Sequence, residues 1–229
     1  MIDPSHPQKE DNPVIAKEFI AALDVIRQEY PGAIPKREIF ALAKECQAMP
    51  VDEVVNLLKD SNVDHRLGAV SILDWKARNN KTSVNEKEEI YYAYMDNHNW
   101  IDDWGMVDRA APYVVGGYLY DKDRDPLYKL AKSESPMERR TAIVSTYFFI
   151  RKNDIDDTFS IAEILVSDKN EYVQKAVGSW IREAGKRDEA RLKAFLDEHA
   201  CAMPRVTLRY AIEKLDRQTK DYYLAMKGG

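Results

Sequence analysis

The chain of 229 residues is long enough for one large domain or two small ones, and its 45% hydrophobic and 32% charged content is typical of a globular protein. No run approaches the ~20 apolar residues of a membrane span, and the start, MIDPSHPQKEDNP, has no apolar signal core. The cysteines, Cys46 and Cys201, lie far apart without a CxxC motif, which excludes a disulfide framework and a structural zinc site. We therefore expect a cytoplasmic protein with no membrane association.

The net charge of −5 is unevenly distributed. Residues 1–135 carry 17 Lys/Arg against 24 Asp/Glu, a net of −7, whereas residues 136–229 carry 17 against 15, a net of +2. A nucleic-acid-binding surface would therefore have to be local and formed largely by the second half.

Apolar residues recur at three- and four-residue spacing along almost the whole chain, which predicts an all-α fold. No proline occurs from 51 to 111 or from 137 to 203, and the one β-rich run, VSTYFFI (144–150), continues a helical pattern. Helices are predicted over 14–30, 36–49, 51–60, 63–79, 85–96, 101–111, 125–132, 136–152, 156–167, 170–185, 187–199 and 204–216.

The predicted helices come in pairs that recur every ~35–45 residues, as with 136–152 and 156–167, then 170–185 and 187–199. This spacing favours a HEAT-like helical-repeat solenoid with a concave groove, and an irregular helical bundle is the alternative. We expect a flexible N-terminal arm over 1–13, a single domain over 14–220 and a C-terminal tail over 221–229.

Common catalytic and cofactor motifs are missing, including GxGxxG, GxxxxGK[ST], HExxH, GxSxG and an EF-hand loop. The four histidines have no partner at the third or fourth following position. We therefore expect neither a metal nor an organic cofactor, and hydrolases with a serine or cysteine nucleophile are not indicated.

The segment HNWIDDWGMVDRAAP holds the most suggestive cluster. Trp104 and Asp108 are four residues apart, hence on one helix face, and Trp100 is one further turn back. A carboxylate flanked by indoles suits a cationic ligand, because ring faces attract positive charge. The alternative is structural: Trp104 fills the core and Asp108 pairs with a basic neighbour such as Arg109.

Basic clusters recur after residue 136. Arginines near a helix N-terminus need anionic partners, and for Arg139 and Arg140 these are either Glu134 and Glu138 or phosphates. Each cluster alone suits a solvated face, but a concave solenoid would align them into a phosphate-binding stripe. The candidate DNA-binding residues are Arg139, Arg140, Lys175, Arg182, Arg205 and Arg209.

Several separated runs occur in the order found in one family: WGMVD, APYVVGGYL, ERRTAIV, VQKAVGSWIREAGKRD and MPRVTLRYAIEKL. Over roughly residues 30–216 the chain resembles the AlkD-like DNA alkylation repair proteins, which are HEAT-like-repeat DNA glycosylases. The resemblance implies that Asp108 is the catalytic aspartate, that Trp104 is its neighbouring tryptophan and that Arg140 meets the DNA backbone.

One position departs from that family. Its second active-site tryptophan follows a glycine directly, whereas here Ser179 follows Gly178 and Trp180 comes one residue later. One residue is about 100° around a helix, so a regular helix would turn Trp180 partly away from the groove, whereas a local π-bulge would restore it. Trp180 is therefore a third candidate catalytic residue.

The resemblance implies a monofunctional DNA glycosylase that hydrolyses the N-glycosidic bond of cationic alkylpurines, such as 3-methyladenine and 7-methylguanine, in duplex DNA. We expect a monomer without cofactors. The alternatives are a HEAT-repeat protein that binds DNA structures without catalysis, or a protein-interaction scaffold that docks through its acidic first half.

Overall fold

A computed structural model describes residues 15–226, and this part of the chain is helical without any strand. The prediction of an all-α fold is confirmed, and the arm predicted over 1–13 lies outside the described residues. The α-helices are α1 (Ala16–Glu29), α2 (Lys36–Glu45), α3 (Val51–Leu58), α4 (Val63–Arg78), α5 (Val84–Met95), α6 (Trp104–Ala111), α7 (Gly117–Leu119), α8 (Asp125–Leu130), α9 (Pro136–Ser145), α10 (Tyr147–Ile150), α11 (Asp156–Ile164), α12 (Glu171–Gly185), α13 (Glu189–His199), α14 (Arg205–Ala211) and α15 (Arg217–Ala225).

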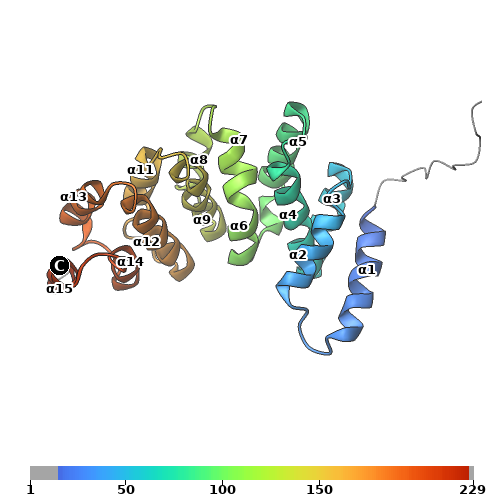
Figure 1. The fold of residues 1–229 in the computed structure, drawn as a ribbon, viewed down its shortest axis with the longest axis horizontal. Helices are drawn as coiled ribbons and strands as arrows, with labels where there is room; N and C mark the ends of the chain where they lie inside the picture. Colours follow the sequence, from blue (N-terminus) through green and yellow to red (C-terminus); the bar gives the residue numbers. More distant parts are fainter. Residues whose placement is uncertain (1–14, 227–229) are drawn as a thin grey trace, which may run out of the picture.

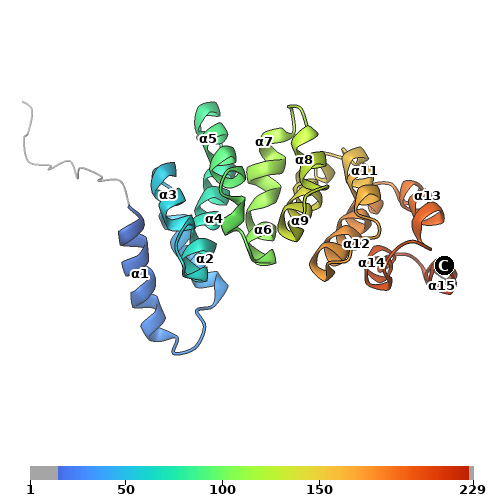
Figure 2. The ribbon, with the colours of Figure 1, turned by 180° about the vertical axis from the view of Figure 1, so that it is seen from behind.

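The helices form an elongated row in chain order (Figure 1), with α1 and α15 at opposite ends. One line of helices packs successively, α2 on α4, α4 on α6, α6 on α9, α9 on α12 and α12 on α14. Helices α3, α5, α11 and α13 lie beside this line, on its upper side in Figures 1 and 2. Each helix of the first line therefore has its chief neighbours before and after it in the sequence.

Local sequence explains where most helices begin. Asn62, Ser83, Ser135 and Asn170 cap α4, α5, α9 and α12, because each side chain accepts a hydrogen bond from a free backbone N–H of the first turn. In α6, Asp103 has this role, accepting from the Gly105 N–H at 2.8 Å.

Several elements differ from the sequence prediction, and the helix predicted over 136–152 is divided into α9 and α10. The helix predicted over 101–111 begins only at Trp104, because the Asp103 cap fixes its start and Trp100 lies in a separate 3₁₀ turn. After Ala111 the chain does not end its helix but continues through a π-helical segment, Pro112–Gly116, into α7. The tail expected from residue 221 is helical as far as Ala225, since α15 starts at the cap Asp216.

A close approach of two helices depends on a glycine. A Cβ placed on Gly178 of α12 would lie 2.4 Å from the backbone oxygen of Thr207 and 2.6 Å from Cβ of Tyr210, both on α14. Only the absence of a side chain lets these backbones come so close. This contact fixes the position of α14 beside α12.

Candidate functional site

A pocket of about 770 Å³ opens where α6, α9, α10, α12 and α14 meet. Aromatic and charged side chains dominate its lining. The lining residues are Trp104, Asp108, Arg140, Tyr147, Tyr172, Lys175, Ala176, Ser179, Trp180, Arg182, Glu183 and Tyr210.

Trp104 and Asp108 both line this pocket, as their four-residue spacing predicts. Trp104 is the first residue of α6 and is 41% exposed, while the Asp108 side chain is 34% exposed. Trp100 is not part of the lining, because it precedes the helix. The site therefore presents one indole and one carboxylate from adjacent turns of α6.

Asp108 pairs with Arg140 of α9, not with Arg109. Arg140 donates from Nε to one Asp108 oxygen at 3.0 Å and from a terminal nitrogen to the other at 2.8 Å. Arg109 instead contacts the buried Asp74 at 3.1 Å. The sequence suggested Arg109 as the structural partner of Asp108, and this was wrong. The successive helices α4, α6 and α9 bring together charged residues that are about thirty positions apart in the chain.

Arg140 links three parts of the site. Its other terminal nitrogen donates to the backbone oxygen of Tyr172, and its guanidinium carbon lies 5.7 Å from the Trp104 ring centroid. Only 7% of the residue is exposed. A buried guanidinium with all three nitrogens engaged fixes the Asp108 carboxylate in one orientation, since bidentate pairing specifies geometry as well as charge.

A buried neutral cluster lies behind this ion pair. The Thr141 hydroxyl is 2.8 Å from Nε2 of His98 and 3.1 Å from the hydroxyl of Tyr94. Burial lowers the pKa of His98, with the Glu138 carboxylate opposing the shift, and burial also raises the pKa of Tyr94. Neutral groups thus anchor the first turns of α9 to the preceding helices.

Both Ser179 and Trp180 line the pocket, although α12 is a regular α-helix throughout. No π-bulge is present in α12, and the Trp180 ring packs on Tyr147 of α10 with centroids 4.9 Å apart. The regular helix thus turns the ring towards a neighbouring helix and still leaves Trp180 in the pocket lining. The π-helical segment lies elsewhere, at Pro112–Gly116.

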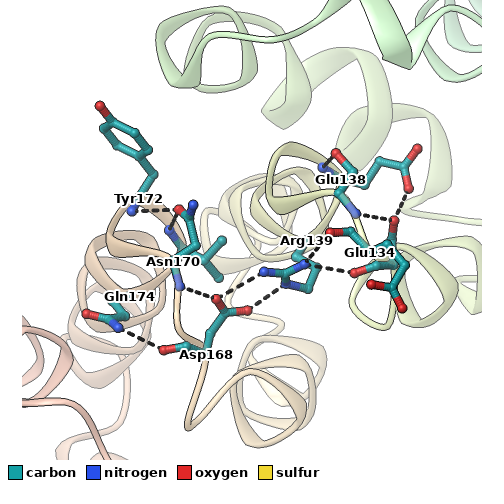
Figure 3. Close-up of polar contacts among 10 residues, drawn as sticks. Glu134, Glu138, Arg139, Asp168, Asn170, Tyr172 and Gln174 are labelled. Atoms are coloured by element: carbon teal, nitrogen blue, oxygen red, sulfur yellow. Dashed lines mark hydrogen bonds and ion pairs between the residues drawn. The ribbon is translucent and has the colours of Figure 1, made fainter.

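Arg139 lies in a different network from Arg140 (Figure 3). Its Nε and a terminal nitrogen donate to Asp168 at 2.6 and 3.2 Å, and its remaining terminal nitrogen donates to the backbone oxygens of Ser133 and Glu134. The carboxylates of Glu134 and Glu138, which the sequence suggested, are not its partners. With all three of its guanidinium nitrogens engaged, Arg139 ties α9 to the loop before α12 and does not line the pocket.

The remaining basic candidates divide into two groups. Lys175 and Arg182 line the pocket, paired with Glu171 at 2.6 Å and with Glu213. Arg205 instead donates to the backbone oxygens of Leu224 and Met226 near the end of α15, and Arg209 is not part of the lining. The structure therefore brings three predicted cations, including Arg140, to one place.

Sequence reasoning missed the tyrosines of the pocket. Tyr147 follows Arg140 by seven residues, and Tyr172 precedes Ser179 by seven, so each shares a helix face with a residue already singled out. Tyr210 had no such signal, because its place depends on the approach of α14 to Gly178.

Within residues 15–226, no group of three or more His, Cys, Asp or Glu side chains is arranged to hold a metal ion. The same residues include no helix with the length and apolar character that crossing a bilayer requires.

The family model described as DNA alkylation repair enzyme matches residues 10–215. The chain belongs to this family. No protein of curated function matches the sequence. The fold of this DNA alkylation repair family member is similar to that of a solved structure described as a predicted DNA alkylation repair enzyme from Enterococcus faecalis, with a TM-score of 0.61 and 15% identity over 90% of this chain and 99% of that chain. The resemblance stated from the sequence motifs is thereby confirmed at the level of the family.

Proposed function

We propose that the protein is a monomeric DNA glycosylase in which the row of helices acts as a HEAT-like solenoid and binds duplex DNA along its groove. It hydrolyses the N-glycosidic bond of cationic alkylpurines, of the 3-methyladenine and 7-methylguanine type. The observation that carries this proposal is the convergence of Asp108, Trp104 and Trp180 on one pocket.

The chemistry requires little acid catalysis. Alkylation places a positive charge on the purine, so the base leaves as a neutral molecule when the bond between its nitrogen and C1′ of the sugar breaks. The sugar becomes oxocarbenium-like, and water then adds to C1′ and loses a proton. Asp108 can stabilise the sugar cation and orient that water, while the Trp104 and Trp180 rings offer π-density to positive charge.

Arg140 serves as the positioning residue for this carboxylate. Its two hydrogen bonds hold the Asp108 oxygens, and the bond to Tyr172 ties the same guanidinium to α12. A phosphate beside the lesion would be bound at the guanidinium edge, in place of or alongside these partners.

The test is base release from methylated duplex DNA by the Asp108→Asn protein. We expect excision to slow by about 10²-fold or more while DNA affinity changes only a few-fold, as for loss of one preorganised electrostatic group. Asp121→Asn is the matched control, because that exposed carboxylate lies after α7 and outside the pocket. An unchanged single-turnover rate in Asp108→Asn would contradict the assignment.

A non-catalytic DNA-binding protein is the second candidate. The bidentate pair favours it, because Arg140 already neutralises Asp108 without DNA. Wild-type protein that binds duplex DNA with a steep salt dependence, yet releases no methylated base, would support this function. Absence of any salt-dependent DNA binding would favour a protein scaffold.

A further inference from the structure

The exposed aromatic side chains of this protein are concentrated at the pocket. Within residues 15–226 five aromatic residues are classed as exposed, Tyr92, Trp104, Tyr172, Tyr210 and Tyr222. Three of them line the one pocket, and they come from three different helices, α6, α12 and α14. Their exposed fractions are 41%, 43% and 37% for Trp104, Tyr172 and Tyr210. Core packing does not explain large rings that remain exposed together in this way.

Two of these rings are nearly parallel. The centroids of Trp104 and Tyr172 are 6.4 Å apart and the ring planes differ by 17°. Figure 3 shows the Tyr172 ring directed away from the Asp168–Arg139 network, while its backbone is held by Asn170. The orientation of α12 therefore presents the ring, and the Arg140 bond to the Tyr172 carbonyl fixes its base.

Tyr210 adds a third exposed ring to the pocket, from α14. The Gly178 contact brings Cβ of Tyr210 against α12. The Glu171 carboxylate chiefly raises the pKa of Lys175, and the nearby phenols of Tyr210 and Tyr172 add to the shift. Lys175 lines the pocket together with both rings, one turn after Tyr172 on α12.

The charge of the pocket suits a polyanion only weakly. Its lining has three cations, Arg140, Lys175 and Arg182, and two carboxylates, Asp108 and Glu183. Lys175 and Arg182 also pair with Glu171 and Glu213, which lie outside the lining. A ligand of this site must gain affinity from the ring faces as well as from phosphate contacts.

We propose that Trp104, Tyr172 and Tyr210 form an aromatic row on which unpaired bases of a DNA strand stack, with Lys175 and Arg182 contacting its phosphates. Bases inside an intact duplex have no free face to offer, whereas single-stranded or gapped DNA does. The inference rests on the proposed function in placing DNA at this pocket. It adds that the protein prefers DNA whose nucleotides are unpaired there.

The experiment compares binding of unmodified single-stranded oligothymidylate with binding of an unmodified duplex of the same length, at one salt concentration. We expect wild-type protein to bind the single strand more tightly. Tyr172→Ala and Tyr210→Ala should each weaken that binding by about 5- to 150-fold, the loss of one stacked base. Duplex affinity should change less than about twofold, since no ring is stacked on paired bases.

Matched variants separate stacking from other effects. Tyr172→Phe and Tyr210→Phe keep the ring and should bind like wild type, and Tyr222→Ala removes an exposed ring outside the pocket. Tighter binding of the duplex by wild type, equal losses on both DNAs, or an equal loss in Tyr222→Ala would overturn the inference.

Unmodified DNA contains no base to excise, so this measurement is independent of catalysis. Base release from methylated duplex by the same variants then reports separately on the proposed function. Excision without single-strand preference would reject the aromatic row alone. Single-strand preference without excision would reject only the glycosylase.

Discussion

Asp108 of α6 and Arg140 of α9 form a two-point ion pair, with nitrogen–oxygen distances of 3.0 and 2.8 Å. The arginine is nearly buried and the carboxylate is one-third exposed, so the pair has one face toward the pocket. The same guanidinium holds the backbone of α12 at Tyr172. The geometry of the candidate site and the packing of three helices therefore depend on one side chain.

Arg140→Ala should lower both stability and DNA affinity. We expect the free energy of unfolding to fall by about 2 kcal/mol, because charged hydrogen bonds to Asp108 and to the Tyr172 carbonyl are lost while the carboxylate can still be hydrated. Duplex binding should weaken for all sequences, and the slope of log affinity against log salt should decrease by about 1. Denaturant unfolding and salt titrations measure the two effects.

Arg151→Ala is the control for this variant, since Arg151 is an exposed arginine at the end of α10 and outside the pocket lining. A loss of stability in Arg140→Ala with an unchanged salt slope would mean that Arg140 is structural only and contacts no phosphate.

Substitutions at Ser179 and Trp180 should lower function in two different ways. Trp180→Ala removes the ring that packs on Tyr147 and should lower the free energy of unfolding by about 2 kcal/mol, less than for a fully buried indole. The same variant should also excise methylated bases more slowly.

Ser179→Trp adds an indole to a pocket wall that already has one, and should weaken DNA binding by filling the open volume. Ser179→Ala is the control and should leave both properties unchanged. Higher activity in Ser179→Trp would show that Trp180 does not serve as the second ring.

Stability should depend on pH through His98. Since burial lowers its pKa below the ordinary value of 6.5, the unfolded chain takes up this proton at a higher pH than the folded protein. The stabilisation is complete above pH 6.5 and decreases as the pH falls below it, by up to about 1.4 kcal/mol per unit, until folded His98 is itself protonated. His98→Gln should flatten this part of the stability curve, as measured by denaturant unfolding at several pH values. An identical curve for His98→Gln and wild type would exclude the assignment.

Gly178→Ala should destabilise the protein despite the higher helix propensity of alanine. Its Cβ would meet the Thr207 carbonyl oxygen at 2.4 Å, and backbone cannot yield cheaply, so we expect a loss of about 1–3 kcal/mol. Gly32→Ala is the matched control: no atom lies within 4 Å of its added Cβ, and we expect a gain of about 0.4–1 kcal/mol. Thermal denaturation of both variants checks this; a stable Gly178→Ala protein would mean that α14 can shift away from α12.

Helical periodicity was sufficient to predict the all-α fold and most helix positions, because those depend on neighbours within a few residues. The pairing of Trp104 with Asp108 on one face followed from the same local rule. The helices predicted from 136 and from 170 begin in the structure at Pro136 and Glu171, directly after the caps Ser135 and Asn170.

Ion-pair partners could not be predicted in this way. Arg139 binds Asp168, and Arg140 binds Asp108, both across about thirty residues of chain. Closeness in the sequence suggested Glu134 and Glu138 instead. Closeness in the sequence does not indicate which helices pack together, so the true partners could not be found from it. Trp180 was a candidate from the sequence and lies in the pocket lining, but whether α12 is regular or bulged at this position could not be predicted.

The successive packing of α2, α4, α6, α9, α12 and α14 has a consequence for motion. A helix in the middle of such a row is held from two sides, whereas α14 has only α12 and the short α15 as its main supports. Backbone amides of α14 and α15 should exchange with solvent deuterium before those of α6 and α9. The side of the pocket that α14 forms with Tyr210 would then open by local unfolding more often than the side that α6 forms with Asp108.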